Sequence, residues 1–518
     1  MYPATFAATR PDFPAAIMAG SGQRLTYREL DARSARLARH LRLIGLRRGD
    51  HVALLSDNDL RVFEVYWAAL RSGFYLTAVN SHLAPGEVAH IVNDCEAKAL
   101  IGSARLAGLL DKIVDDTPRV QQRLCFGGEL AGHGDYEVAL AAQPDGPLED
   151  QPCGADMLYS SGTTGLPKGI LLPLPDRQVD EPGDTVTAVF GPLFGFDENT
   201  VYLSPAPLYH AAPLRYCAMT HRTGGTVIVM ERFDAEQALS LIERYRVTHS
   251  QWVPTMFVRM LKLDEQARAR YDVSSLKVAV HAAAPCPVEV KRQMIDWWGP
   301  VLQEYYAATE TNGITIIDSE QWLAHPGSVG QDGFLGVARI CGDDGDELPT
   351  GEIGTIYFER DELPFSYHND PAKTRSAQHP RHPSWTTIGD IGYLDEERYL
   401  YLTDRKSFTI ISGGVNIYPQ EIENCLTMHP AVLDVAVIGV PDDEMGESVL
   451  AVVQPVAGVR ADDALTRELL DYLGERIARY KLPRRIDFVT ELPRTPTGKL
   501  VKRTIKQRYA AAAAASGE

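Results

Sequence analysis

Tyr159-Ser-Ser-Gly-Thr-Thr-Gly-Leu-Pro-Lys-Gly169 is the stretch from which the fold and the chemistry of this chain can be read. Its glycines and small hydroxyl residues predict a flexible loop whose backbone N–H groups and hydroxyls can surround an anion. Lys168 adds a positive charge at the end of the loop. The pattern is not a Walker A loop, because Gly162 and Gly165 are too close together and Gly169 follows the lysine.

Further short motifs follow this loop. They are, in chain order, Pro207-Leu-Tyr-His210, His281-Ala-Ala-Ala-Pro285, Tyr305-Tyr-Ala-Ala-Thr-Glu310, Thr387-Ile-Gly-Asp390, Asp404-Arg405, Ser412-Gly-Gly-Val-Asn-Ile-Tyr-Pro419 and Arg494-Thr-Pro-Thr-Gly-Lys499. In this order and spacing they resemble the motifs of the adenylate-forming (AMP-binding) superfamily, which includes acyl-CoA synthetases, firefly luciferase and peptide-synthetase adenylation domains. The resemblance is of the acyl-CoA synthetase type and covers nearly the whole chain.

The chain departs from the family pattern at a few positions. Alanine stands in the loop at 281–285 where the family often has glycine, and the motif at 305–310 resembles a pattern written GYGxTE. Ser407 occupies the hinge position, where the family usually has Asp or Lys, and Phe408 replaces the usual acid. A small residue at a hinge can still absorb a change in dihedral angles.

The resemblance implies a site for ATP. Thr309 would donate to the α-phosphate, and Glu310 would bind Mg²⁺ directly or through water, with Thr164 as a second metal ligand. Tyr306 would offer a flat face to adenine, and Asp390 and Arg405 would contact the ribose. The β- and γ-phosphates would contact the loop residues Ser160, Ser161, Gly162, Thr163, Thr164, Gly165 and Lys168, and the adenine would lie near Ala283, Ala284, Pro285 and Tyr305.

Lys499 is implied to be the catalytic cation of adenylation. In the family, this lysine bridges the acid's carboxylate, a ribose oxygen and the α-phosphate, where it neutralises charge in the transition state. It must leave before the thiol of coenzyme A arrives, so the C-terminal domain rotates about a hinge, which is Ser407 in this chain. After rotation, Gly413 and Gly414 would line the passage for the pantetheine arm, since glycine permits close approach.

The acid-binding pocket is the least defined part of the site. Tyr209, His210, Trp252, Ala283 and Ala307 are its candidate walls by motif position. His210 is either a gate beside the carboxylate or a packed core histidine, and the sequence leaves both readings open. Such a wall is mostly apolar with a few polar groups. A fatty acid, a steroid side-chain acid and an aryl-alkanoic acid all fit this pattern.

Composition limits the setting in which the protein acts. Lys and Arg total 51 against 69 Asp and Glu, giving a net charge of −18. This charge disfavours nucleic acid and anionic membranes as main partners. The seven cysteines are scattered and form no C-x-x-C pair, which suits a reducing cytosol. We expect a cytoplasmic enzyme without a secretory signal or transmembrane segment. Peripheral membrane contact is left open, as is the choice between monomer and homodimer.

The distribution of elements predicts an α/β architecture: a large multi-layered N-terminal domain over residues 1–406 and a small mobile C-terminal α+β domain over residues 407–518. Near the N-terminus, the chain predicts a capping box at Thr26 and Glu29, a strand at 51–55, and a helix over about 60–72 that Gly73 would cap. A strand–helix–strand unit follows at 226–230, 235–245 and 248–253. We expect 172–199 to be a surface excursion. In the C-terminal domain, we expect helices at 420–428 and 464–480, strands at 434–440 and 486–489, and a frayed tail at 510–518.

The sequence motifs are compatible with four functions. The first is an AMP-forming acyl-CoA synthetase that makes acyl-AMP and pyrophosphate and then transfers the acyl group to CoA. The second is a stand-alone acyl-AMP ligase that loads a carrier protein, since no carrier domain follows Lys499 in this sequence. A luciferase-like oxygenase and a non-catalytic binding protein are the third and fourth. Retention of Lys168, Glu310, Asp390 and Lys499 favours an enzyme.

Overall fold

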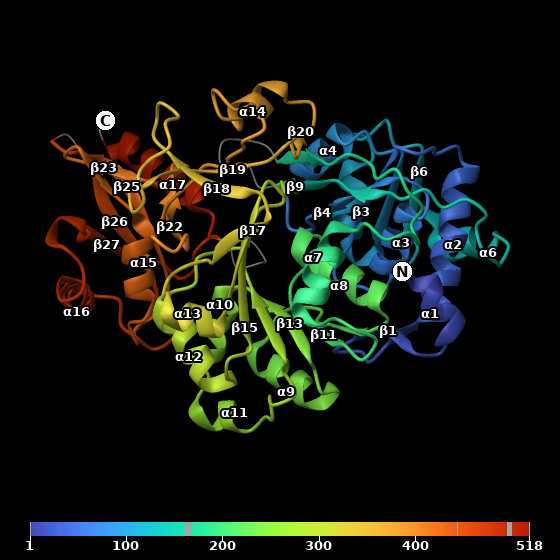
Figure 1. Cartoon of the computed structure of the whole chain (residues 1–518), viewed down its shortest axis with the longest axis horizontal. Helices are drawn as coiled ribbons and strands as arrows, with labels where there is room; N and C mark the ends of the chain where they lie inside the picture. Colours follow the sequence, from blue (N-terminus) through green and yellow to red (C-terminus); the bar gives the residue numbers. More distant parts are fainter. Residues whose placement is uncertain (1, 161–166, 443, 495–499, 517–518) are drawn as a thin grey trace.

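The computed structural model describes residues 2–160, 167–442, 444–494 and 500–516. These residues form five β-sheets with helices between and around them (Figure 1). An N-terminal parallel sheet lies at one end of the molecule, and a C-terminal sheet lies at the other (Figure 1). The prediction of a mixed α/β fold with a large N-terminal and a smaller C-terminal part is confirmed.

The N-terminal sheet is parallel and deeply buried. All residues of its three central strands are buried, as expected for the centre of a parallel sheet that is covered on both faces. In spatial order its strands are β7 (Gly134–Asp135), β6 (Gln122–Phe126), β5 (Ala99–Ser103), β3 (His51–Leu55), β4 (Tyr75–Val79) and β8 (Ala155–Asp156). Its helices are α1 (Pro3–Thr9), α2 (Tyr27–Leu43), α3 (Arg61–Leu70), α4 (Pro85–Asp94), α5 (Ala107–Leu110) and α6 (Tyr136–Ala141).

A nine-stranded sheet forms the centre of the molecule. Its order is β17 (Gln331–Leu335), β16 (Ile314–Asp318), β15 (Leu302–Ala307), β14 (Val278–His281), β13 (His249–Trp252), β11 (Val201–Ser204), β12 (Thr226–Val229), β1 (Pro14–Met18) and β2 (Arg24–Thr26). One face packs with α7 (Thr185–Phe194) and α8 (Ala211–Thr223). The other face packs with α9 (Ala235–Tyr245), α10 (Pro254–Leu261) and α12 (Val288–Trp298). Two shorter helices, α11 (Glu265–Ala269) and α13 (Ser319–Ala324), belong to the same region of the chain.

Two small sheets complete the large part. One consists of β18 (Val337–Cys341), β19 (Gly354–Glu359), β21 (Asp390–Leu394) and β22 (Leu400–Arg405). The other consists of β20 (Ser366–Tyr367), β10 (Lys168–Leu171) and β9 (Leu158–Ser160), with α14 (Pro371–Ser376) after β20 (Figure 1).

The C-terminal part is a sheet packed between helices. Its strands are β24 (Val415–Ile417), β23 (Ile410–Ser412), β26 (Gly446–Pro455), β25 (Val432–Asp442) and β27 (Arg485–Phe488). Its helices are α15 (Pro419–Thr427), α16 (Asp463–Gly474) and α17 (Lys502–Ser516). One face of the sheet shares a buried cluster with α15 and α16, and the other shares one with α17.

Several predicted elements are confirmed. Thr26 and Glu29 form the capping box of α2, and the strand at 51–55 has the predicted bounds. The predicted strand–helix–strand unit is β12, α9 and β13. Gly73 has the left-handed φ expected after a helix, +71°, although α3 itself ends at Leu70 with Arg71 as its C-cap.

Three predictions about elements were wrong. Residues 172–199 are not only a surface excursion, because they contain α7, whose Phe190 and Phe194 are buried. The helix predicted to reach 480 ends at Gly474. Residues 510–516, predicted to be frayed, continue helix α17. Among the described residues, every helix is too short or too polar to cross a membrane.

Candidate active site

Two antiparallel strands, β9 and β10, carry the ends of the predicted anion-binding loop. Lys168 pairs with Ser160, the last residue of β9, and Gly169 pairs with Tyr159. A Cβ atom on Gly169 would lie 2.4 Å from Met157 Cε and 2.9 Å from Tyr159 Cζ, so a larger residue here would have to displace these two side chains. The remaining predicted loop residues, Ser161, Gly162, Thr163, Thr164 and Gly165, lie outside the described residues.

Tyr367 of β20 connects the loop strands to Glu310. β20 pairs with β10, and Tyr367 Oη donates a hydrogen bond of 2.9 Å to Glu310 Oε1. Lys168 Nζ lies 5.9 Å from the centroid of the same ring. Burial and the Glu310 carboxylate both raise the pKa of Tyr367, which keeps its phenol a neutral donor. The structure therefore brings Lys168 and Glu310 together across a tyrosine that belongs to none of the motifs quoted above.

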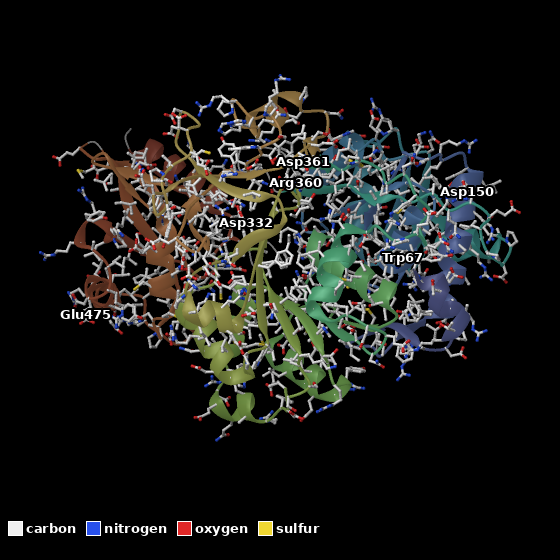
Figure 2. The ribbon with its side chains drawn as sticks, viewed as in Figure 1. Trp67, Asp150, Asp332, Arg360, Asp361 and Glu475 are labelled. Atoms are coloured by element: carbon white, nitrogen blue, oxygen red, sulfur yellow. The ribbon has the colours of Figure 1, made fainter. Side chains whose placement is uncertain are left out.

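The turn after β15 holds Thr309 and Glu310. Glu310 is buried and Thr309 is partly buried. The next residue, Thr311, has a left-handed φ of +49°, which few residues adopt without support. Arg360 supplies support: it follows β19 (labelled in Figure 2) and donates from Nη1 to Thr311 O at 3.3 Å. Sequence reasoning missed this arginine as well, because its partner is a backbone carbonyl 49 positions away.

Tyr306, predicted to face adenine, contacts Asp390, which together with Arg405 was predicted to contact the ribose. Tyr306 Oη donates to Asp390 Oδ2 at 2.8 Å, and Arg405 Nε lies 3.1 Å from Asp390 Oδ1. Asp390 is the first residue of β21 and Arg405 is the last residue of β22, and the two residues are paired in the antiparallel register of these strands. Burial, and then the Asp390 carboxylate, raises the pKa of Tyr306 well above its usual value. Asp390 retains further lone pairs, so it can also accept hydrogen bonds from a ligand hydroxyl.

The loop predicted to lie near adenine follows β14. Ala283 has a φ of +73° and is exposed, while Ala284 and Pro285 are partly buried. The loop enters α12, which is tied to β15 by a buried ion pair of 2.6 Å between Lys291 Nζ and Glu304 Oε2. Breaking a buried pair of this kind costs about 3–5 kcal/mol, so the helix into which the loop leads is held firmly against β15.

The residues predicted to bind the acid divide into two groups. Tyr209 and His210 lie at the start of α8, with ring centroids 4.5 Å apart, and Ala307 is the partly buried last residue of β15. Trp252 differs: it is 1% exposed, its indole donates to Ser250 Oγ at 2.8 Å, and its ring packs against Trp298. Trp252 lies in the cluster on the α10 and α12 face of the sheet, so it is a core residue apart from the other candidate walls.

The predicted hinge lies between two sheets. Ser407 is exposed in the turn that connects β22, in the four-stranded sheet, with β23, in the C-terminal sheet. Gly413 and Gly414 form the turn of the β23–β24 hairpin, with φ of +58° and +78°. Both glycines are exposed. Lys499 lies outside the described residues, and the residues that flank it, Arg494 and Leu500, form a β-bridge with each other.

Comparison with known proteins agrees with this geometry. Residues 4–367 match the family model of the AMP-binding enzymes, and residues 421–499 match the model of the AMP-binding enzyme C-terminal domain. The chain therefore belongs to the AMP-binding enzyme family, and it is a ligase of the acyl-CoA synthetase type within the adenylate-forming superfamily.

Relatives extend over nearly the whole chain. The long-chain-fatty-acid–CoA ligase FadD13 of Mycobacterium tuberculosis is 32% identical over 511 residues, which cover 98% of this chain and 97% of the relative. A feruloyl-CoA synthase of Amycolatopsis is 33% identical over 492 residues, which cover 94% of each chain. The crystal structure of the anthranilate CoA ligase AuaEII with anthranoyl-AMP superposes with a TM-score of 0.85 at 25% identity, covering 99% of this chain and 97% of that one. These three proteins are named for three different acids, so family membership alone does not fix the acid.

Proposed function

We propose that this enzyme activates a hydrophobic carboxylic acid with ATP and transfers the acyl group to coenzyme A. In the first step, an oxygen of the acid's carboxylate attacks the α-phosphorus, and pyrophosphate leaves. In the second step, the CoA thiol attacks the acyl-AMP carbonyl, loses its proton, and displaces AMP. The observation that carries the proposal is the convergence of Lys168, Glu310, Tyr306, Asp390 and Arg405 from separate parts of the chain.

The described residues fit the parts of ATP. Asp390 accepts from the ribose hydroxyls while Tyr306 and Arg405 hold its carboxylate in place. Thr309 donates to the α-phosphate, and Lys168 with the loop at 160–165 contacts the β- and γ-phosphates. Mg²⁺ suits Glu310, because this ion is often held by a single carboxylate together with substrate phosphates and water. When bound, it would offset the negative charge of the triphosphate.

The two half-reactions require a moving C-terminal domain. We propose residues 1–406 as the fixed domain and 407–518 as the mobile one, with Ser407 as the hinge. Lys499 supplies the cation of adenylation and withdraws for thioester formation. The exposed glycine hairpin at Gly413 and Gly414 then lines the path of the pantetheine arm. A cytoplasmic location is proposed with this function, because all seven cysteines are free thiols and both cosubstrates are cytoplasmic.

Separate measurement of the half-reactions tests this proposal. Lys499→Ala should reduce acid-dependent pyrophosphate release by about a hundredfold or more, as expected when a transition-state donor is lost. The same variant should still convert supplied acyl-AMP and CoA to the thioester. Equal loss of both steps would contradict the division of roles. Replacing CoA with a holo carrier protein in the same assay distinguishes the carrier-loading alternative, which predicts transfer to the carrier and not to CoA.

A further inference from the structure

Three tyrosines form a layer between the nine-stranded sheet and helix α8. Tyr202 comes from β11, Tyr216 from α8 and Tyr305 from β15. Their rings stack in sequence: Tyr202 and Tyr216 have centroids 6.1 Å apart at 22°, and Tyr216 and Tyr305 have centroids 6.2 Å apart at 15°. Phe190 of α7 covers the layer, with its ring centroid 5.2 Å from that of Tyr305. We call Tyr202, Tyr216 and Tyr305 the tyrosine layer.

Two hydroxyls of the tyrosine layer are unusual for a protein interior. Tyr202 and Tyr216 are 0% and 2% exposed, and their Oη atoms have no hydrogen-bond partner among the described residues. The third hydroxyl, of Tyr305, accepts from Gln251 Nε2 at 3.1 Å and keeps its own proton to donate. Most buried polar groups in proteins have a hydrogen-bond partner, so two adjacent tyrosines whose hydroxyls have none need an explanation.

The three rings are adjacent, and their hydroxyls remain protonated. Burial raises the pKa of Tyr202 and Tyr216 well above the ordinary value; Cys217 and then Tyr305 raise the pKa of Tyr202 further, and Tyr305 and then Tyr202 raise that of Tyr216. Burial likewise raises the pKa of Tyr305, to about 12. Each hydroxyl can therefore donate a hydrogen bond at neutral pH. Tyr27 and Tyr136 are buried tyrosines that do have partners: Tyr27 Oη donates to Gly225 O at 2.7 Å, and Tyr136 Oη donates to Glu64 Oε2 at 2.8 Å.

Tyr305 brings the tyrosine layer next to the proposed reaction centre. Tyr305, whose motif predicted a place near adenine, is two positions from Ala307 on β15, so its side chain leaves the same face of the strand as this candidate wall of the acid pocket. Tyr306 leaves the other face and contacts Asp390, and we therefore assign Tyr305 to the acid side. Thr309, proposed to bind the α-phosphate, follows Ala307 by two residues. The acyl chain of a substrate that extends along this face from Ala307 would reach Tyr305 after about 7 Å, the rise of two strand residues. The family pattern GYGxTE has glycine where this chain has Tyr305, so the bulk at this point is a feature of this chain.

We propose that the tyrosine layer is the end wall of the acid-binding space, and that the preferred acids are compact ones with a hydroxyl or carbonyl oxygen at the end remote from the carboxylate. The aromatic rings contact the flat or short body of such an acid, and the layer's hydroxyls bond its distal oxygen. A long unbranched chain would meet the rings before it ended and would leave the hydroxyls unpaired. This inference rests on the proposed function and narrows the class of its substrate.

Matched pairs of acids test the proposal. Benzoic and 4-hydroxybenzoic acid, 3-phenylpropanoic and 3-(4-hydroxyphenyl)propanoic acid, and hexanoic and 6-hydroxyhexanoic acid, together with palmitic acid, serve as substrates for pyrophosphate release. We expect kcat/KM to favour the oxygenated member in at least one pair. Tyr216→Phe and Tyr202→Phe, which keep the ring and remove only the hydroxyl, should each lower that preference by about fivefold, the value of one neutral hydrogen bond.

The melting temperature of the enzyme without substrate gives a second readout. Tyr216→Phe and Tyr202→Phe each remove an unpaired buried hydroxyl, so the melting temperature should rise by about 1–2 °C. Tyr27→Phe is the matched control, because it removes a buried hydroxyl that has a partner and does not belong to the tyrosine layer. It should lower the melting temperature and leave the acid preference unchanged. A fall in melting temperature for Tyr202→Phe and Tyr216→Phe would mean that their hydroxyls are paired, which overturns the inference.

The result separates this inference from the proposed function. Pyrophosphate release that is fastest with palmitic acid, or an acid preference unchanged in both phenylalanine variants, would overturn the inference alone. No release with any acid would overturn the proposed function and the inference with it. Tyr305→Ala adds an independent test, since it should open the end wall and raise kcat/KM for palmitic acid relative to hexanoic acid.

Discussion

Ala283 carries backbone strain at the loop proposed to bind adenine. Its φ of +73° is a conformation that favours glycine, and the family often has glycine in this loop. The left-handed conformation destabilises an alanine by about 1 kcal/mol or more. A glycine avoids this strain, but it also raises the entropy of the unfolded chain, so the net gain in stability from the substitution is smaller. We expect Ala283→Gly to raise the melting temperature by about 1–2 °C.

A neighbouring alanine controls for the general effect of glycine. Ala284 has a negative φ, so Ala284→Gly adds flexibility without relieving strain and should lower the melting temperature. If both variants lower it to the same extent, Ala283 is not strained in solution.

His221 makes the stability of the large part sensitive to acid. It is 0% exposed, and Trp67 Nε1, from the buried tryptophan labelled in Figure 2, donates to its Nδ1 at 3.2 Å. Burial lowers the pKa of His221 to about 3. As the pH falls below about 6.5, the unfolded chain takes up a proton that the folded protein does not, so stability falls by up to about 1.4 kcal/mol per pH unit until the folded pKa is reached.

The expected change is in the slope of stability against pH. His221→Gln keeps an acceptor for Trp67 but cannot be protonated, so its melting temperature should fall less than that of the parent between pH 6.5 and pH 4.5. Parallel profiles for the two proteins would show that His221 does not titrate differently on unfolding.

At the scale of elements, α17 is fixed by its first residue. Lys502 Nζ lies 2.8 Å from Glu423 Oε1 of α15 and 5.2 Å from the ring centroid of Phe408, next to the proposed hinge. Glu423 Oε1 also accepts from Val437 N of β25 at 2.6 Å. Both charged side chains are buried, at 6% and 8% exposed. Lys502 follows Lys499 by three residues, so this pair positions the end of the segment that carries the proposed catalytic lysine.

Removal of one partner should therefore loosen the C-terminal part. Lys502→Met leaves the buried Glu423 carboxylate without its cation, so we expect the local free energy of opening to fall by about 3 kcal/mol. This change corresponds to a roughly hundredfold loss of hydrogen-exchange protection in β25 and β26. The double variant with Glu423→Gln removes the stranded charge and keeps an acceptor for Val437, so it should recover part of the loss. A double variant as exposed to exchange as the single one would rule out the ion pair as the cause.

Sequence reasoning succeeded where the information is local. Motif and capping patterns located α2, β3 and β12–α9–β13, and the pairing of β21 with β22 brings Asp390 and Arg405 together as the motifs predicted. It failed where a side chain is defined by distant partners: Tyr367 and Arg360 reach the site through long-range contacts. The prolines and glycines at 172–199 concealed α7, because its burial depends on a sheet that the local sequence does not describe.

At the scale of the whole molecule, Lys262 links the large N-terminal part to the C-terminal part by a hydrogen bond. Lys262, at the C-cap of α10, donates from Nζ to Val432 O of β25 at 2.5 Å. The neighbouring Asp434 pairs with Arg494, which flanks the segment carrying Lys499. Met428 of the C-terminal part also packs against the cluster that contains α10 and α12. The large part therefore contacts the strand whose Asp434 pairs with Arg494, and we predict that this contact favours the domain arrangement used for adenylation.

Lys262→Met should shift the balance between the two domain arrangements. Loss of a hydrogen bond from a charged donor is worth about 1.5 kcal/mol, so we expect acid-dependent pyrophosphate release to fall by about tenfold. Thioester formation from supplied acyl-AMP needs the other arrangement and should be unchanged or faster. Lys112→Met, at an exposed lysine of the large part, is the control and should alter neither step. Equal slowing of both steps by Lys262→Met would mean that this contact supports the fold in general and does not select the arrangement for adenylation.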